Sequence, residues 1–372
     1  MKICLIAPIP PFKGGIAKYC YSLARELEER HDLLLLSYRR QYPSLLTGNR
    51  PQRDPSVDYA AVSSQFRNVS YELDSLNVLS WLAAARRVSE FSADLVILPW
   101  WVTYWAPQYL WFLRYFRKRG IKCLLLCINV YDHEESRVKN ILTRFVLRRA
   151  ERMIVHSGGE LRELEAINRT ASMCTHLLPV FSYQRMIPVP HKGIQCLNLL
   201  FFGFVRPYKG LDLLLRALVL VRELDIRLKV VGEFWHGTDE YVQLIRELDI
   251  AGVVEIIDRY VDDQEMSGYF AGADVVVLPY RTSKTSGVIA TSYGYGKPVL
   301  AADVGGFHEV IRDGHTGRLV PPLSVPALAE GIRWFYESRG TDFAGNISSF
   351  VEERMSWHSL VDAIEEISGN VG

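Results

Sequence analysis

Short, continuous apolar runs alternate with segments of helical periodicity along almost the whole chain. In the first half the runs are KICLIAP at 2–8, DLLLLS at 32–37, SADLVILP at 92–99, IKCLLLCIN at 121–129 and RMIVHS at 152–157. The second half has LNLLFFG at 197–203, IRLKVVGE at 226–233, VVEIID at 253–258, ADVVVLPY at 273–280, KPVLAA at 297–302 and GRLVPP at 317–322. Strands that are apolar on both faces are typical of parallel sheets covered by helices. The alternation therefore predicts an α/β fold.

The length of 372 residues predicts two domains, because a single hydrophobic core rarely grows that large. The stretch VFSYQRMIPVPHKGIQC at 180–196 has prolines and no periodicity, so it separates the halves. We expect a Rossmann-like domain at 1–182, a linker at 183–196, a second Rossmann-like domain at 197–355, and a C-terminal helix at 356–372 that could pack back on the first domain. Such doubly wound parallel sheets would face each other across a cleft that binds ligands at the strand C-terminal ends. Residues 39–75 are polar and turn-rich, and we interpret them as an insertion.

The net charge of +1 gives no indication of nucleic-acid binding, but the charge is unevenly distributed. Residues 1–190 carry 26 Lys and Arg against 17 Asp and Glu, whereas residues 191–372 carry 17 against 25. The basic first half favours an anionic partner there, such as a lipid headgroup or a phosphate. The alternative is that the opposite charges only steer the docking of the two domains.

Two sequence features predict a cytoplasmic location. The apolar run at the N-terminus is too short for a signal peptide. The six cysteines are scattered and form no CxxC pair, which is typical of reduced core residues. The uncharged stretch 95–113 is interrupted by Pro99 and Pro107, so we interpret it as a strand, a loop and a helix rather than a membrane span.

Aromatic and basic residues gather in the segment 100–119. On a helix that begins at Ala106, one stripe with core spacing contains Tyr109, Phe112, Leu113 and Phe116. Trp111 and Tyr115 lie off this stripe, beside Arg114 and Lys118. Such a combination is typical of a surface that binds an anionic membrane peripherally. A second helix-packing face is the alternative.

Two loops have the composition of anion-binding turns. Gly14 and Gly15 stand where the first strand turns into a helix, so backbone amides there could approach an anion; a plain tight turn would look the same. In the second half, Arg206 and Lys209 lie between a strand and a helix that Gly210 opens. An Arg and a Lys in this position can hold a diphosphate, the Arg through two hydrogen bonds and the Lys as a point charge.

Several motifs carry a resemblance to a known family. FFGFVRPYKGLDLLL, VVGEFW, ADVVVLPY and GVIATSYGYGKPVLAADVGGFHEVIRDGHTGRLVPP are similar to the donor-binding domain of family 4 glycosyltransferases. PPFKGGIAKYCYSLARELEER, near the N-terminus, resembles their acceptor-binding domain. The resemblance implies the GT-B fold of two Rossmann-like domains. It also implies transfer of a sugar from a nucleotide diphosphate sugar with retention of configuration, without a bound metal or another cofactor.

The resemblance implies a role for each matching position. Arg206 and Lys209 would hold the donor diphosphate, although the Arg stands two residues later than in the usual glycine–arginine pair. Further expected donor contacts are the backbone amides of Ser286, Gly287 and Val288, the stretch Tyr260-Val261 against the base, Glu233 at a strand end, and the Gly14-Gly15 loop.

The chain departs from the family at two places. Where family members have two glutamates, one near the sugar and one on the ribose, this chain has Ser283 and Thr291. Hydroxyls still hydrogen-bond a ribose, but each lost charge-assisted bond weakens binding by roughly 1–2 kcal/mol. A histidine that often follows one strand of the first domain is replaced by Ile128, and His133 is our candidate for contacting the sugar. A solvent-facing loop histidine is the alternative for His133.

These observations together predict a retaining glycosyltransferase. Its acceptor would be a glycan or a lipid-linked molecule at the cytosolic face of a membrane. One alternative is a catalytically silent relative that binds a nucleotide sugar or a partner protein, which the two missing acids favour. Another is a sugar-nucleotide epimerase of the same shape, which would need acid–base carboxylates at the site.

Overall fold

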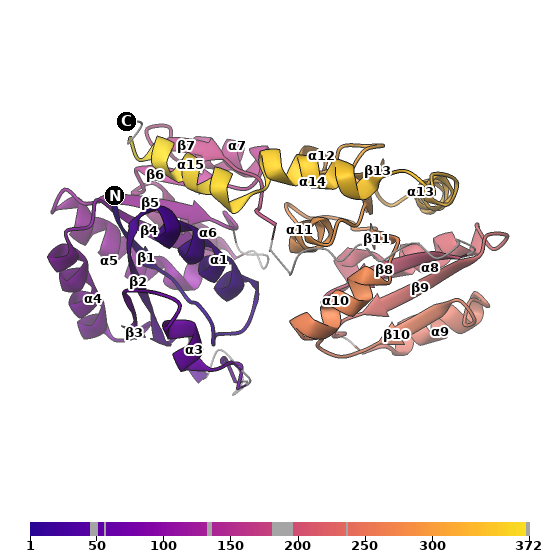
Figure 1. Cartoon of the computed structure of the whole chain (residues 1–372), viewed down its shortest axis with the longest axis horizontal. Coiled ribbons are helices and arrows are strands. Elements are labelled where there is room, and N and C mark those ends of the chain that lie inside the picture. The colour runs from indigo at the N-terminus through magenta and orange to yellow at the C-terminus, as the bar shows by residue number, and fades with distance from the viewer. Residues whose placement is uncertain (45–50, 56, 132–135, 181–195, 236, 370–372) are drawn as a thin grey trace. The chain divides into compact units, whose positions relative to one another are not determined.

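The structure is a computed structural model that describes residues 1–44, 51–55, 57–131, 136–180, 196–235 and 237–369 (Figure 1). Backbone contacts divide the chain into two compact units. Unit 1 comprises Met1–His176 and Trp357–Gly372, and unit 2 comprises Leu177–Ser356.

Unit 1 is built on a parallel sheet with the strand order β3-β2-β1-β4-β5-β6-β7 in the described residues. Its strands are β1 Lys2–Ile6, β2 Asp32–Arg40, β3 Val69–Asp74, β4 Leu95–Trp100, β5 Lys122–Cys127, β6 Arg152–Val155 and β7 Ser172–Thr175. The five apolar runs of the first half form β1, β2, β4, β5 and β6, as predicted. All six residues of the central strand β4 are buried, because helices cover both faces of the sheet.

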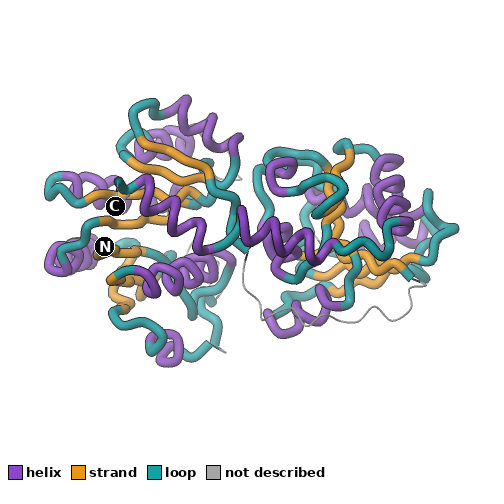
Figure 2. Tube along the Cα trace, turned by 45° about the horizontal axis from the view of Figure 1, so that its top comes forward, coloured by secondary structure: helices purple, strands orange, loops and turns teal. Residues whose placement is uncertain are grey.

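The helices of unit 1 follow its strands and lie on both sides of them (Figure 2). They are α1 Gly15–Arg30, α3 Tyr59–Ser63, α4 Val78–Phe91, η1 Thr103–Trp105, α5 Ala106–Arg117, α6 Arg137–Leu147, α7 Gly158–Ile167 and α15 Trp357–Ile367. The C-terminal helix α15 packs on α1. Tyr19 of α1 contacts the Trp357 ring at a centroid distance of 5.0 Å, and Arg30 pairs with Asp362 at 2.7 Å and with Glu365 at 2.9 Å.

The interpretation of residues 39–75 as an insertion is wrong. This segment contains α3 and the strand β3, which pairs in parallel with β2. The strand β7 also went unpredicted. Both strands lie at the edges of the sheet and are largely half-buried or exposed, so neither shows the continuous apolar run of a central strand.

Unit 2 has a second parallel sheet, in the order β10-β9-β8-β11-β12-β13. Its strands are β8 Leu197–Phe202, β9 Ile226–Val231, β10 Val254–Ile257, β11 Val275–Leu278, β12 Val299–Ala302 and β13 Gly317–Val320. Its helices are η2 Pro207–Lys209, α8 Leu211–Val219, α9 Asp239–Glu247, α10 Asp263–Ala271, α11 Gly287–Gly294, α12 Phe307–Val310, α13 Val325–Glu337 and α14 Phe343–Arg354. All six strands were predicted from their apolar runs. The two sheets confirm two Rossmann-like, doubly wound parallel domains.

The chain passes from unit 1 to unit 2 after His176. Leu177 and Val180 already belong to the core of unit 2, and the Val180 amide donates to the carbonyl oxygen of Met355 at 2.9 Å. We expected the first domain to extend to residue 182. The expected linker at 183–196 falls, up to residue 195, outside the described residues.

The helix α5 has the buried stripe that its spacing predicted: Tyr109, Phe112, Leu113 and Phe116 are all buried. Trp111 is half-buried, stacks on Tyr115 at 5.1 Å and lies 6.3 Å from the Trp81 ring of α4. The contacts of Trp111 favour the second helix-packing face over a free membrane-binding surface. No helix within the described ranges is both long enough and apolar enough to cross a bilayer.

Candidate functional site

Lys209 of unit 2 is a buried lysine with a lowered pKa. It ends the short helix η2 directly after β8, and only 7% of the residue is exposed. Burial, and then the nearby positive charge of Arg206, lowers the pKa of Lys209 to about 8. An ammonium group that loses water in this way needs a compensating negative charge.

No carboxylate of the described residues forms an ion pair with Lys209. Asp212, in the first turn of α8, pairs instead with Arg281 at 2.5 Å. The Lys209 Nζ lies 5.6 Å from the centre of the Tyr280 ring, a contact that stabilises a cation only weakly. The site therefore has a buried positive charge for which a bound anion is the natural partner.

Gly203, at the end of β8, marks the place where three parts of the site meet. A Cβ atom built on Gly203 would lie 3.1 Å from Lys209 Nζ and 3.7 Å from Val288 Cγ2. Its φ of +94° also lies in the region that side-chain-bearing residues avoid. Gly203 at the strand end therefore lies close to both the buried Lys209 ammonium and the first turn of α11.

Arg206 is positioned by stacking. Its Cζ lies 3.5 Å from the centre of the Trp235 ring, in the segment that follows β9. Trp235 in turn meets Phe204 edge to face at 6.0 Å. Phe204 stands where the usual glycine–arginine pair of the resembled family has its arginine, so the aromatic stack holds the displaced guanidinium beside Lys209.

The N-terminus of α11 presents backbone amides to the same site. Ser286 caps the helix, and its Oγ accepts from the Val288 amide at 3.2 Å. The Ser286 side chain also hydrogen-bonds the buried Tyr280 hydroxyl, whose pKa burial raises. An α-helix N-terminus next to Lys209 adds partial positive charge, which suits a phosphate.

Ser283 and Thr291 each donate their hydroxyl proton to local backbone. Ser283 Oγ donates to the Thr285 carbonyl oxygen at 2.8 Å, and Thr291 Oγ1 donates to the Gly287 carbonyl oxygen at 2.9 Å. Their lone pairs then remain for a ligand, so both hydroxyls can act as acceptors. A carboxylate likewise accepts a hydrogen bond from a ribose hydroxyl.

The loop after β12 closes against the turn before α11. The Gly306 amide donates to the Lys284 carbonyl oxygen at 3.0 Å. A Cβ atom on Gly305 would lie 2.0 Å from the Ser283 carbonyl oxygen, so only glycine permits this approach. The turn at 283–286 is therefore held in place from two sides, by this loop and by the cap of α11.

The ends of β9 and β10 supply the remaining predicted residues of unit 2. Glu233 is half-buried, and its carbonyl oxygen accepts from the Val205 amide at 2.9 Å, next to Arg206. Tyr260 is 55% exposed, whereas Val261 is buried in the core. Tyr260 is therefore free to stack on a base, and Val261 would contribute backbone only.

Two family models match the chain. The model described as "Glycosyl transferase 4-like domain" matches residues 14–175, and the one described as "Glycosyl transferases group 1" matches residues 197–338. The chain belongs to the family 4 glycosyltransferases and has the GT-B fold. The resemblance of the sequence motifs to this family is thereby confirmed.

Individual relatives agree with this assignment. The D-inositol 3-phosphate glycosyltransferase of Streptomyces coelicolor is 32% identical over 179 residues, which are 45% of this chain and 39% of that protein. The chain spans less than half the length of the curated relatives it matches. The Anabaena protein HepE in complex with UDP superposes with a TM-score of 0.72 at 18% identity, covering 98% of this chain and 99% of that one. The sucrose-phosphate synthase of Thermosynechococcus elongatus superposes with a TM-score of 0.71 at 17% identity, covering 98% of each chain.

The structure brings most of the residues that we predicted for donor binding to one edge of the unit 2 sheet. Lys209 and the first turn of α11 both lie close to Gly203, and Arg206 is near enough to Lys209 to lower its pKa. Gly14 and Gly15 belong to unit 1, where both are exposed and open α1, Gly14 with a φ of +102°. His133 lies outside the described residues.

Sequence reasoning assigned no role to Trp235, Phe204 and Tyr280. All three follow or end a strand at the same edge of the sheet. Their position shortly after a predicted strand was the one feature of the sequence that could have indicated a role at the site. Without the fold, nothing indicated that Trp235 lies on Arg206.

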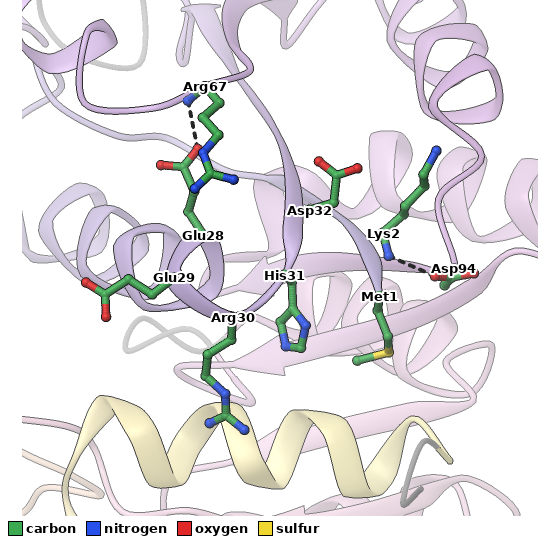
Figure 3. A pocket seen from close by; sticks show the side chains of 9 residues that line it. All are labelled: Met1, Lys2, Glu28, Glu29, Arg30, His31, Asp32, Arg67 and Asp94. Atoms are coloured by element: carbon green, nitrogen blue, oxygen red, sulfur yellow. Dashed lines mark hydrogen bonds between the residues drawn. The ribbon is translucent and has the colours of Figure 1, made fainter.

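A separate pocket of about 660 Å³ lies in unit 1 (Figure 3). Its lining mixes acids and bases from the start of β1, the end of α1 and the start of β2, among them Lys2, Glu28, Arg30 and Asp32. This is the N-terminal edge of the sheet, opposite to the edge where doubly wound sheets bind ligands. We do not assign the donor to it. The described residues contain no group of three His, Cys, Asp or Glu side chains arranged to hold a metal.

Proposed function

We propose that this chain is a retaining glycosyltransferase that takes a sugar from a nucleotide diphosphate sugar and transfers it to a glycan or lipid-linked acceptor at the cytosolic face of a membrane. The observation that carries the proposal is Lys209, a buried ammonium without a carboxylate partner among the described residues. A diphosphate would supply the missing charge. The HepE structures that contain UDP and UDP-glucose support UDP as the first nucleotide to try.

In the proposed reaction, the bond between the sugar C1 and the diphosphate oxygen breaks, and its electron pair stays on that oxygen. The acceptor hydroxyl forms the new bond to C1 on the same face and passes its proton to the departing diphosphate. Arg206, Lys209 and the α11 amides stabilise the growing negative charge. The stretch 281–302 contains no carboxylate to serve as a protein nucleophile, which agrees with assistance by the leaving group.

The specific rival is a catalytically silent relative, and the hydroxyls of Ser283 and Thr291 in place of two acids favour it. We would incubate the chain with a panel of nucleotide sugars and a membrane lipid extract, and measure the free nucleoside diphosphate. The proposal expects release that needs both one donor and the extract. Lys209→Met should lower this release by about 100-fold or more.

A silent relative would bind nucleoside diphosphate in a titration but release none from any donor. An epimerase would convert the donor sugar without the extract. Either result contradicts the proposal.

A further inference from the structure

The helix α6 of unit 1 has two apolar stripes, and only one of them is buried. Thr143, Val146 and Leu147 face the core. On another side of the helix, Val138, Ile141, Leu142 and Phe145 are 66%, 55%, 38% and 49% exposed. Their spacing of i, i+3, i+4 and i+7 places them in one continuous stripe.

The orientation of α6 is fixed by its buried side. Thr143 Oγ1 and Thr103 Oγ1 of η1 lie 2.9 Å apart in a buried hydrogen bond, and the helix packs on α5. Rolling the helix to bury the exposed stripe would break this bond and expose Val146 and Leu147. The stripe is therefore a stable feature of the surface.

Arginines border the stripe. Arg137, Arg144 and Arg148 fall along one of its edges by helical spacing, and Arg149 continues it at the C-terminal end. The Arg149 guanidinium lies 5.2 Å from the centre of the Phe145 ring, and Arg144 Nε donates to the Tyr131 hydroxyl at 3.4 Å. Residues 136–150 contain no Asp or Glu.

These arginines have no acidic partner in the part of the chain that the structure describes. Arg144 and Arg148 are four residues apart, a like-charge spacing that destabilises an isolated helix. An apolar stripe with a row of arginines at its edge is the composition of a helix that lies in a membrane interface. The arginine stems can extend along the apolar surface while their heads meet lipid phosphates.

We propose that the exposed face of α6, made of Val138, Ile141, Leu142, Phe145 and the four arginines, binds an anionic phospholipid surface. A second protein copy fits less well, because four side chains along about 10 Å of helix are far short of the roughly 800 Å² per partner that a stable interface buries. The proposal deepens the proposed function, on which its link to a lipid-linked acceptor rests. Vesicle binding itself does not depend on sugar transfer.

The test is co-sedimentation of the full chain with vesicles of mixed neutral and anionic phospholipid at low ionic strength. Arg144→Gln with Arg148→Gln should weaken binding by about 25-fold, since each arginine near the surface contributes about fivefold. Ile141→Ser with Phe145→Ser should weaken vesicle binding by at least about tenfold, because two apolar side chains that would enter the lipid are lost. All these side chains are exposed, so the melting temperature and nucleoside diphosphate affinity should not change.

Two control variants are matched to these changes. Leu220→Ser removes a comparably exposed apolar side chain from unit 2. Arg114→Gln with Lys118→Gln removes two charges at the C-terminal end of α5. Neither should release the protein from the vesicles.

Three results would overturn the proposal. The wild type could fail to sediment with anionic vesicles. The α5 pair could release the protein while the α6 variants do not. Last, Ile141→Ser with Phe145→Ser could convert a dimer to a monomer in solution without any vesicle binding. Because donor titration is measured separately, a failure here leaves the proposed reaction standing, and a failed transfer assay leaves this surface standing.

Discussion

The end of β8 in unit 2 and the helix α6 in unit 1 both hold positive charge without an acidic partner in the described residues. At β8 the buried charge is the ammonium of Lys209. Only 7% of this residue is exposed, and its pKa is lowered to about 8. At α6 the charge is a row of exposed arginines beside an apolar stripe.

The difference in burial decides what each region can bind. A buried cation interacts strongly with a small anion that fits against it, because little solvent screens the pair. Exposed arginines interact weakly one by one and need many anions on an extended surface. The first region therefore suits a diphosphate, and the second suits a lipid surface, as we propose.

The largest effect is expected when the buried charge is removed. Lys209→Met should lower turnover about 100-fold or more, the scale for losing one preorganised charge contact. Arg206→Ala should do the same. Wild-type-like turnover in both variants would exclude this site as the diphosphate site.

The same Lys209→Met change should stabilise the protein without ligand. The pKa of Lys209 is about 8 in the fold and 10.5 in the unfolded chain, so the charged form opposes folding at every pH below about 8, and this penalty disappears as the pH rises toward 10.5. The gain in unfolding free energy at pH 7 should reach as much as roughly 3 kcal/mol. Lys229→Met is the control, because Lys229 is half-exposed and pairs with Glu255 at 3.1 Å. A lower melting temperature for Lys209→Met alone would show that the buried lysine supports the fold.

Ligand binding at the two regions should differ in its dependence on salt concentration. Raising the ionic strength from low to physiological values should weaken vesicle binding by about tenfold or more, because exposed arginines are screened. Nucleoside diphosphate affinity should fall only about twofold to threefold, since Lys209 is shielded from solvent. Equal salt dependence in titration and sedimentation experiments would remove the distinction.

Removing the ring that stacks on Arg206 should have an intermediate effect on nucleoside diphosphate affinity. Trp235→Leu removes the ring that lies 3.5 Å from the guanidinium, and nucleoside diphosphate affinity should fall about fivefold, the scale of a cation–π contact. Trp334→Leu is the matched control, because its ring lies 5.2 Å from Arg318 on the strand β13. Similar affinities for both variants would mean that Arg206 needs no support.

An effect of similar size is expected at Thr291. Thr291→Val removes one acceptor for the ribose, and affinity should fall by a few-fold to about tenfold. Thr291→Ser keeps the hydroxyl and should bind like the wild type. A deoxyribose nucleotide should bind the wild type and the Val variant almost equally. An unchanged Kd for Thr291→Val would move the ribose contact elsewhere, with Glu233 the next residue to test.

Sequence patterns predicted every strand of the unit 2 sheet and the five inner strands of the unit 1 sheet, but they missed the two edge strands of unit 1. Buried strands show continuous apolar runs, whereas the edge strands β3 and β7 do not. Local patterns also predicted part of the site. Arg206, Lys209 and the start of α11 were predicted from their position between a strand and a helix. The burial of Lys209 and the stack of Trp235 on Arg206 depend on contacts between segments far apart in the chain, which no local pattern reports.

The most direct measurement of the central claim is proton uptake when nucleoside diphosphate binds. Calorimetric titrations at pH 8 in buffers of different ionisation enthalpy report this quantity. Free Lys209 is about half protonated at that pH, and a bound diphosphate would protonate it fully, so we predict uptake of about half a proton. Lys209→Arg, which stays charged, should bind with no uptake. Binding by the wild type without proton uptake, or the same uptake in the Arg variant, would contradict the assignment of Lys209 as the partner of the diphosphate.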